Sequence, residues 1–165
     1  MKEITAAEWK VNPFTAIGKD WMLIAATKDG KTNMMTASWG GMGVLWGADV
    51  VFVFIRQSRF TKEFIEGSDK FSLTFFAPEY RKTMAYIGSH SGRDEDKIAK
   101  TGLHVVTDEE TPYFEEAHTA VLCTKWSKHP IRMEDMPEDV RQRWYADGDY
   151  HDMYIGRIEK ILVKQ

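Results

Sequence analysis

The sequence predicts a mainly β protein, a small antiparallel barrel with helices inserted between about six or seven strands. Residues Val50 to Ile55 form a short run of β-branched and aromatic residues, which favours a buried strand over a helix. In Lys70 to Phe76 apolar and polar residues alternate, which is the period-two pattern of a strand. Since strands and helices do not alternate regularly along the chain, the pattern argues against a doubly wound parallel sheet.

The composition is that of a folded, acidic protein. The chain of 165 residues fits a single domain, residues 1–165, and is long enough to bury a core. Its net charge of −3 gives no basic footprint for nucleic acid. The N-terminal residues contain no apolar signal core, and no run approaches the length of a membrane span. One cysteine suits a reducing compartment, so we expect a cytoplasmic protein without nucleic-acid or membrane partners.

The N-terminal half is predicted to contain a hairpin, a further strand and a helix. Asp29 and Gly30 mark the hairpin turn. The G-G-M-G segment at 40–43 lacks the spacing of a dinucleotide-binding fingerprint, and we interpret it as a tight turn. Gly67 closes the helix. The predicted strands are 21–26, 33–39 and 50–55, the helix is 61–66, and residues 1–20 are a lead-in.

The C-terminal half is predicted to contain several strands and short helices. Pro78 opens a helix that ends at Gly88, and a second short helix ends near Gly102. The acidic segment 108–116 is predicted to be a solvated surface loop. Gly156 marks a bulge in the last strand. The remaining predicted elements are strands at 70–76, 117–126 and 150–163, a helix at 137–146, and a loop or edge strand at 105–112.

Two short segments have the chemistry of a ligand site. Arg56, Ser58, Arg59 and Thr61 place two guanidinium groups and two hydroxyl groups at the start of the helix, a combination that suits a phosphate. The same residues could instead serve as helix caps and surface charges. The small residues of T-A-S-W at 36–39 would let a flat ring approach the backbone, although small residues at strand ends commonly serve turns.

Three ordered motifs carry a family resemblance. They are N-x-M-T-A-S-W-G-G from Asn33, R-x-S-R-x-T from Arg56, and S-x-S-G-R-D-x-D-K from Ser89. Together they resemble the flavin reductase-like family with an FMN-binding split barrel, of which flavoredoxin is one member type. The resemblance runs from about Asn12 to Arg157. It implies an antiparallel Greek-key split β-barrel, non-covalently bound FMN, a homodimer, and NADH or NADPH as the electron donor to the flavin.

The resemblance also implies which residues form the site. His151, in G-D-Y-H, resembles a histidine that many relatives place near the flavin and the nicotinamide, although a lone histidine after a turn is more often structural. Many relatives have Asn where this chain has Thr74, so a flavin contact from Thr74 is not implied. The implied cofactor-binding residues are Asn33, Thr36, Ala37, Ser38, Trp39, Arg56, Ser58, Arg59, Phe60, Thr61, Ser89, Ser91, Arg93 and Lys97.

Other chemistries find less support in the sequence. The five histidines lack metal-ligand spacing, so no metal site is expected. Cys123 lies in an alternating strand and is expected to be buried and inert. The tryptophans are expected mostly in the core or a dimer interface, with Trp39 and Trp46 bordering a flavin ring.

Three functions remain open from the sequence. The first is a flavin reductase that moves hydride from NAD(P)H to flavin, with the small-molecule nicotinamide and an electron acceptor as its partners. The second is an FMN-binding electron-transfer or flavin-carrier protein without NAD(P)H activity of its own. The third is an interaction protein whose basic loop binds some other anion.

Overall fold

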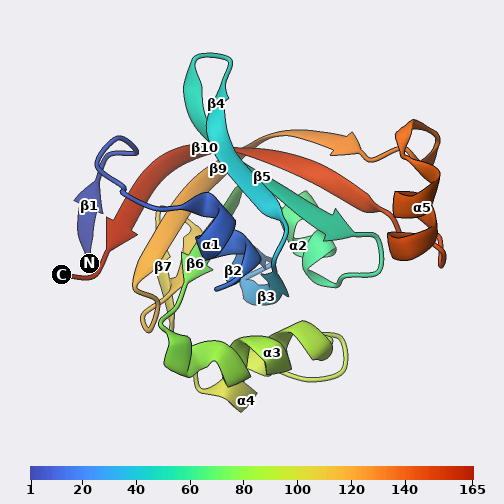
Figure 1. The fold of residues 1–165 in the computed structure, drawn as a ribbon. Helices are drawn as coiled ribbons and strands as arrows, with labels where there is room; N and C mark the ends of the chain where they lie inside the picture. The colour runs from blue at the N-terminus through green and yellow to red at the C-terminus, as the bar shows by residue number, and fades with distance from the viewer.

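The computed structural model of residues 1–165 is an antiparallel β structure with helices at its margins (Figure 1). Eight strands form one sheet in the order β3-β2-β6-β9-β10-β5-β4, with β1 added beside β10, and β7 pairs with β8 alone. The strands are β1 (Lys2–Ile4), β2 (Met22–Lys28), β3 (Lys31–Ala37), β4 (Gly40–Leu45), β5 (Ala48–Arg56), β6 (Lys70–Phe75), β7 (Val105–Asp108), β8 (Thr111–Phe114), β9 (Thr119–Pro130) and β10 (His151–Val163).

The helices are short and lie around the sheet (Figure 1). They are α1 (Pro13–Gly18), α2 (Thr61–Glu66), α3 (Arg81–Ser89), α4 (Lys97–Thr101) and α5 (Glu138–Trp144), with 3-10 turns at Pro78–Tyr80 and Met133–Asp135. None of them is both long enough and apolar enough to cross a membrane. The predicted mainly β antiparallel fold with inserted helices is confirmed. The strand count was too low, and the lead-in contains β1 and α1.

Two apolar clusters hold the sheet together. The larger cluster lies between β2, β5, β6, β9 and β10, and includes Ile24, Val53, Phe71 and Tyr154. The smaller one packs α3 and the β7–β8 hairpin against β2 and β3. Gly156 interrupts the β9–β10 register as predicted. A Cβ there would lie 2.4 Å from the Phe71 ring, so the bulge makes room for that aromatic side chain.

The glycine-rich segment 40–43 is strand β4 and not the tight turn that we predicted. Gly40 pairs with Val53, and a Cβ at Gly40 would lie 2.9 Å from the carbonyl oxygen of Phe52. The close approach of β5 therefore explains that glycine. The turn comes later, at Trp46 and Gly47, which both have positive φ (51° and 74°), as a two-residue hairpin requires.

The acidic segment 108–116 is also more ordered than predicted. It contains the turn and second strand of the β7–β8 hairpin, and Glu109 and Glu110 make the turn with positive φ. Phe114 is completely buried, and the Ser72 hydroxyl donates a 2.5 Å hydrogen bond to the Pro112 carbonyl. The charged residues at the turn precede strand β8, in which Thr111, Pro112 and Phe114 are buried.

None of the tryptophans is fully buried in the core, so the expectation of core or dimer-interface positions stays a prediction for the interface. All six are at least partly exposed, and Trp39, Trp46 and Trp144 are exposed. Trp46 packs against Trp126 with ring centroids 5.9 Å apart. Cys123, in contrast, is completely buried as predicted, and burial raises the pKa of its thiol well above its usual value.

Candidate functional site

Two adjoining cavities bring most of the predicted site residues together. The first, which we call the cationic cavity, has a volume of about 310 Å³ and is lined by Met35, Arg56, Ser58, Arg59, Phe60, Thr61, Ser89, His90, Ser91, Gly92 and Lys97. The second, the strand-end cavity, has about 270 Å³ and is lined by Met35, Thr36, Ala37, Ser38, Trp39, Phe54, Arg56, Arg59, Trp144 and His151. They share Met35, Arg56 and Arg59, so they form one continuous groove.

Two of the cations that line the cationic cavity, Arg59 and Lys97, lack a matching negative charge. Arg59 donates to the Gly88 carbonyl at 2.9 Å, and Lys97 donates to the Met34 and Ile87 carbonyls at 2.7 and 3.1 Å. Neither side chain has a carboxylate within ion-pair distance. Burial lowers the pKa of Lys97 to about 8, and Arg59 adds to this effect. A bound anion would relieve this unfavourable concentration of charge.

Arg56 is held differently from Arg59. Its guanidinium donates to the carbonyls of Asp149 and Trp144 at 2.6 and 2.8 Å, and it lies 3.8 Å from the Asp149 carboxylate. Ser58 is also engaged, because its N–H and its hydroxyl both donate to that carboxylate. The end of β5 is thereby joined to the segment between α5 and β10.

Asn33 and Arg93 lie outside both cavities, and their contact with a cofactor stays a prediction. Asn33 is buried, and its amide donates to the Thr61 hydroxyl at 2.9 Å. Arg93 pairs with Glu63 at 2.7 Å and donates to the Ser58 carbonyl. Both residues line a neighbouring polar cavity. Their contacts are those of residues that hold the start of α2 in place.

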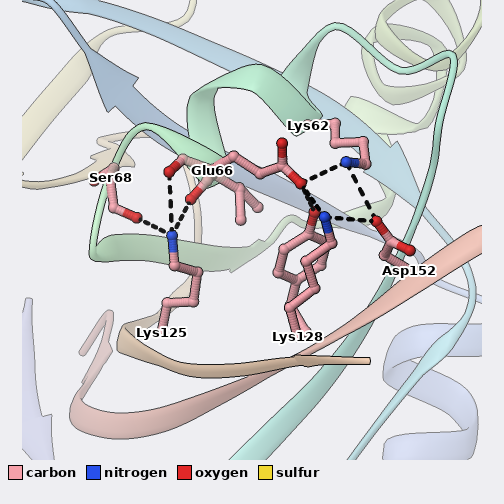
Figure 2. A network of polar contacts seen from close by, with 8 residues as sticks. Lys62, Glu66, Ser68, Lys125, Lys128 and Asp152 are labelled. Carbon is pink, nitrogen blue, oxygen red and sulfur yellow. Dashed lines mark hydrogen bonds and ion pairs between the residues drawn. The ribbon is translucent and has the colours of Figure 1, made fainter. Parts of the chain in front are cut away.

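A network of lysines and carboxylates holds the rest of α2 (Figure 2). Lys62 lies 2.5 Å from Glu66 and 3.2 Å from Asp152. Lys128 bridges the same two carboxylates, 3.1 Å from Asp152. Lys125 donates to the carbonyls of Ile65, Glu66 and Ser68, which are acceptors left free at the end of a helix. Because α2 follows directly after Arg56–Phe60, this network fixes the wall of the cationic cavity.

The strand-end cavity forms where β3 ends and the sheet opens. The Thr36 hydroxyl donates to the Met84 carbonyl at 2.6 Å and ties β3 to α3. Ser38 and Trp39 fall between β3 and β4, outside both strands. The Trp39 ring lies edge-on to Trp144 and near His151, with ring centroids 5.0 Å apart in both pairs. The cavity therefore has aromatic walls and a short stretch of backbone outside the strands.

His151 is a buried neutral group at the edge of this cavity. Only 8% of its surface is exposed, and its Nδ1 lies 2.8 Å from the Tyr145 hydroxyl. Burial and, to a smaller extent, the nearby Arg56 charge lower the pKa of His151 to about 4. At neutral pH the imidazole carries no charge, so it can donate and accept hydrogen bonds but is not protonated to act as a general acid.

Sequence reasoning missed several residues that shape the two cavities. Phe54 was predicted to lie in a buried strand, but nothing in the sequence shows that it lines this groove. Asp149 stands in the G-D-Y-H motif, yet its partner Ser58 is 91 residues away. Thr74 is buried in β6 and lines neither cavity. The missed residues are Met35, Phe54, His90, Gly92, Trp144, Tyr145 and Asp149.

The fold and groove define a known class of domain. The family model described as "Flavin reductase like domain" matches residues 15–165, so the chain belongs to that family. It is 31% identical over 96 residues to the protein named "Uncharacterized protein YddH" of Escherichia coli (strain K12). That match covers 58% of this chain and spans about half (49%) of the length of the curated relative.

Solved structures show the same fold at low sequence identity. Flavoredoxin of Desulfovibrio vulgaris (Miyazaki F) is 23% identical, with a TM-score of 0.71, over 100% of this chain and 78% of its own. The FMN-binding protein from Thermus thermophilus with bound p-hydroxybenzaldehyde is 20% identical, also with a TM-score of 0.71, over 100% of this chain and 83% of its own. The predicted FMN-binding split-barrel fold is thereby confirmed.

Proposed function

We propose that this protein binds FMN without a covalent bond and reduces it with NADH or NADPH. The observation that carries the proposal is the pair of unmatched cations, Arg59 and Lys97, in a cavity that continues into an aromatic-walled one. The cations of the first cavity would attract the phosphate of FMN, and the aromatic walls of the second would hold its flat ring. Family membership and the flavoredoxin and FMN-binding structures of the same fold support this assignment.

The chain's own residues would bind and orient the two ends of the cofactor. Arg59 and Lys97 supply the charge for the phosphate, and the hydroxyls of Thr61, Ser89 and Ser91 line the same cavity. Helix α2 has only six residues, so we assign the main attraction to these side chains and not to a helix dipole. The backbone of Ser38 and Trp39, which lies outside the strands, would hydrogen-bond the edge of the ring.

The bound flavin would supply the hydride acceptor, its N5 atom. Hydride transfer needs no general base, which agrees with the neutral His151 and with the absence of an acid–base pair facing the groove. The residues around the strand-end cavity then act by holding one ring and leaving room for another within near-attack distance. We expect His151→Ala to leave FMN content near wild type and to slow flavin reduction. Loss of soluble protein would instead show a structural role.

Anaerobic stopped-flow absorbance tests the proposal directly. With FMN-loaded protein, bleaching of the flavin band should saturate with NADH or NADPH, and nicotinamide deuterated at the transferred position should react more slowly. If neither nicotinamide bleaches the band within minutes while dithionite does, the reductase proposal fails. The electron-transfer or flavin-carrier function would then replace it. A colourless protein that takes up no FMN would leave the third function, binding of another anion.

We further propose that the protein works as a homodimer. Two large apolar side chains, Val44 and Trp46, are 73% and 65% exposed. Val44 and Trp46 lie at the tip of the β4–β5 hairpin, which projects from the body of the protein (Figure 1). Sedimentation should give about twice the chain mass of 19.1 kDa, and a monomer that holds FMN tightly would contradict this. A cytoplasmic location and a single domain over 1–165 stay predictions.

A further inference from the structure

A third cavity, which we call the apolar cavity, adjoins the strand-end cavity. It has a volume of about 540 Å³ and lies between α1, the start of β4 and the end of β5. Its walls include Phe14, Ile17, Trp39, Met42, Phe54 and Ile131. Cavities of this size and character are typical of sites for small organic molecules. The hydrogen bonds that hold Arg56, Arg59 and Lys97 in the cationic cavity involve none of the residues that line the apolar cavity.

The apolar cavity and the strand-end cavity share three wall residues, Ser38, Trp39 and Phe54. A molecule in the apolar cavity would therefore lie beside whatever occupies the strand-end cavity. In the proposed function that neighbour is the flavin ring. The apolar cavity is thus on the route by which electrons would leave the ring for a second molecule.

The lining of the apolar cavity carries no charged side chain, in contrast to the other two. Ser38 supplies its single side-chain hydroxyl, and Phe14, Trp39 and Phe54 supply three aromatic rings. A charged ligand would lose water there without gaining a partner. The lining therefore selects flat, uncharged molecules with at most a few hydrogen-bonding groups.

We propose that the apolar cavity binds the electron acceptor, and that this acceptor is an uncharged aromatic carbonyl compound of the quinone class. Reduction of a quinone converts its two carbonyl groups into two hydroxyl groups. It takes up two electrons and one proton, equivalent to the hydride given by the reduced nicotinamide, and a second proton from solvent. The nicotinamide leaves oxidised. The acceptor role rests on the proposed function, whereas binding in the cavity does not.

Calorimetric titration with two probes tests the charge selectivity. 1,4-Naphthoquinone and 1,4-naphthoquinone-2-sulfonate have the same rings and differ by one fixed negative charge. The neutral probe should bind roughly tenfold or more tightly than the sulfonate, because the lining cannot compensate the charge. Cys123 is buried, so the quinone does not reach the thiol. Equal affinities, or no binding of the neutral probe, would overturn the proposal.

Gly41 and Gly43 offer a matched pair of variants. Gly41 lines the cavity and is paired with Phe52, on the same face of β5 as Phe54. An added Cβ at Gly41 meets only the Phe52 ring, at 3.6 Å, so a side chain is accommodated. Gly41→Leu should fill the cavity and weaken naphthoquinone binding roughly tenfold. Gly43→Leu lies two residues along the same strand, outside the cavity, and should change nothing. Equal effects of the two would contradict the assignment.

Phe14 provides a test that does not disturb the core. Its side chain is 86% exposed, so Phe14→Lys should fold, and the new cation should shift preference toward the sulfonate roughly tenfold. An unchanged ratio would place the probe elsewhere. FMN affinity should stay at the wild-type value in all three variants. Both titrations are repeated without FMN. Failure of the protein to bind FMN would refute the proposed function. Binding of the quinone would then be judged from the titrations without FMN.

Discussion

Asp149 and Ser58 are joined by two hydrogen bonds, although they are 91 residues apart in the chain. The Ser58 N–H donates to Asp149 Oδ1 at 3.0 Å, and the Ser58 hydroxyl donates to Oδ2 at 2.6 Å. The serine that the sequence motif offered to a phosphate is therefore already bound to a carboxylate. Since Arg56 also donates to the Asp149 carbonyl, Asp149 joins the R-Q-S-R turn to the start of β10.

We expect Asp149→Ala and Ser58→Ala to weaken FMN binding by a similar amount, roughly tenfold to a hundredfold, as for loss of a charge-assisted hydrogen bond. The double variant should lose no more than either single one, because both changes remove the same link. Fluorescence titration of FMN measures this. Asp147→Ala is the control, since that carboxylate is exposed and 3.7 Å from Arg56. Additive losses would mean that Ser58 contacts the ligand directly.

Arg59 and Arg93 should differ in their effect on the phosphate. Arg59 faces the cationic cavity, whereas Arg93 is bound to Glu63 on its outer side. Arg59→Ala should weaken FMN by about 1.5–3 kcal/mol, the range for a hydrogen bond to a charged group, and should leave riboflavin binding almost unchanged. Arg93→Ala should have a smaller effect that is equal for both ligands. Equal losses for FMN and riboflavin in Arg59→Ala would show that Arg59 does not touch the phosphate.

Lys97 should make both stability and FMN binding depend on pH. Its pKa falls from 10.5 to about 8 on folding, through burial, so the unfolded chain binds more protons between these values. Stability of the FMN-free protein should therefore rise with pH across that window. FMN affinity should fall above pH 8, as the protonated amine is lost.

Lys97→Gln keeps donors for the Met34 and Ile87 carbonyls and removes the charge. Urea denaturation at pH 7 and pH 9.5 should show a smaller gain in stability for this variant than for wild type. Lys100→Gln, at an exposed position on the same helix, should behave like wild type. If Lys97→Gln keeps the wild-type pH dependence, another group is responsible.

His151 should stay neutral across the physiological range. Its pKa is lowered from 6.5 to about 4 by burial and by Arg56, so acidification from pH 6.5 to pH 4 should cost stability. Imidazole NMR signals followed against pH measure the ionisation directly. His104 is the internal control, because its hydrogen bond to Glu116 raises the pKa. A titration midpoint above pH 6 for His151 would show that its imidazole is not buried in the way described here.

Asp152 should contribute more to the stability of the fold than an exposed carboxylate does, because its buried side chain pairs with two lysines. Its side chain is 4% exposed and faces Lys62 and Lys128 at 3.2 and 3.1 Å (Figure 2). Asp152→Asn should cost about 2–3 kcal/mol in urea denaturation, less than for a fully buried pair because Lys128 is partly exposed. Glu138→Gln removes the exposed pair with Arg141 and should cost less than about 1 kcal/mol. Equal costs would show that the network contributes no more than a surface pair.

Local patterns in the sequence determined the elements of the sheet. The alternation in 70–75 predicted β6, because side chains on a strand repeat every two residues. The short apolar run in 50–55 predicted β5. The composition of R-Q-S-R-F-T and T-A-S-W pointed to the two walls of the groove. These segments carry their chemistry within a few residues, so their meaning is readable from the chain alone.

Only the tertiary structure decided which groups are free to act. Arg59 and Arg93 both belong to motifs that resemble those of the family. In the folded chain, however, Arg59 lines the cationic cavity, whereas Arg93 is bound to Glu63 of α2. The pKa of Lys97 follows from burial beneath α3 and β3, which no sequence pattern encodes. Desolvation and charge pairing depend on neighbours in space, and here those neighbours, such as Ser58 and Asp149, come from distant parts of the chain.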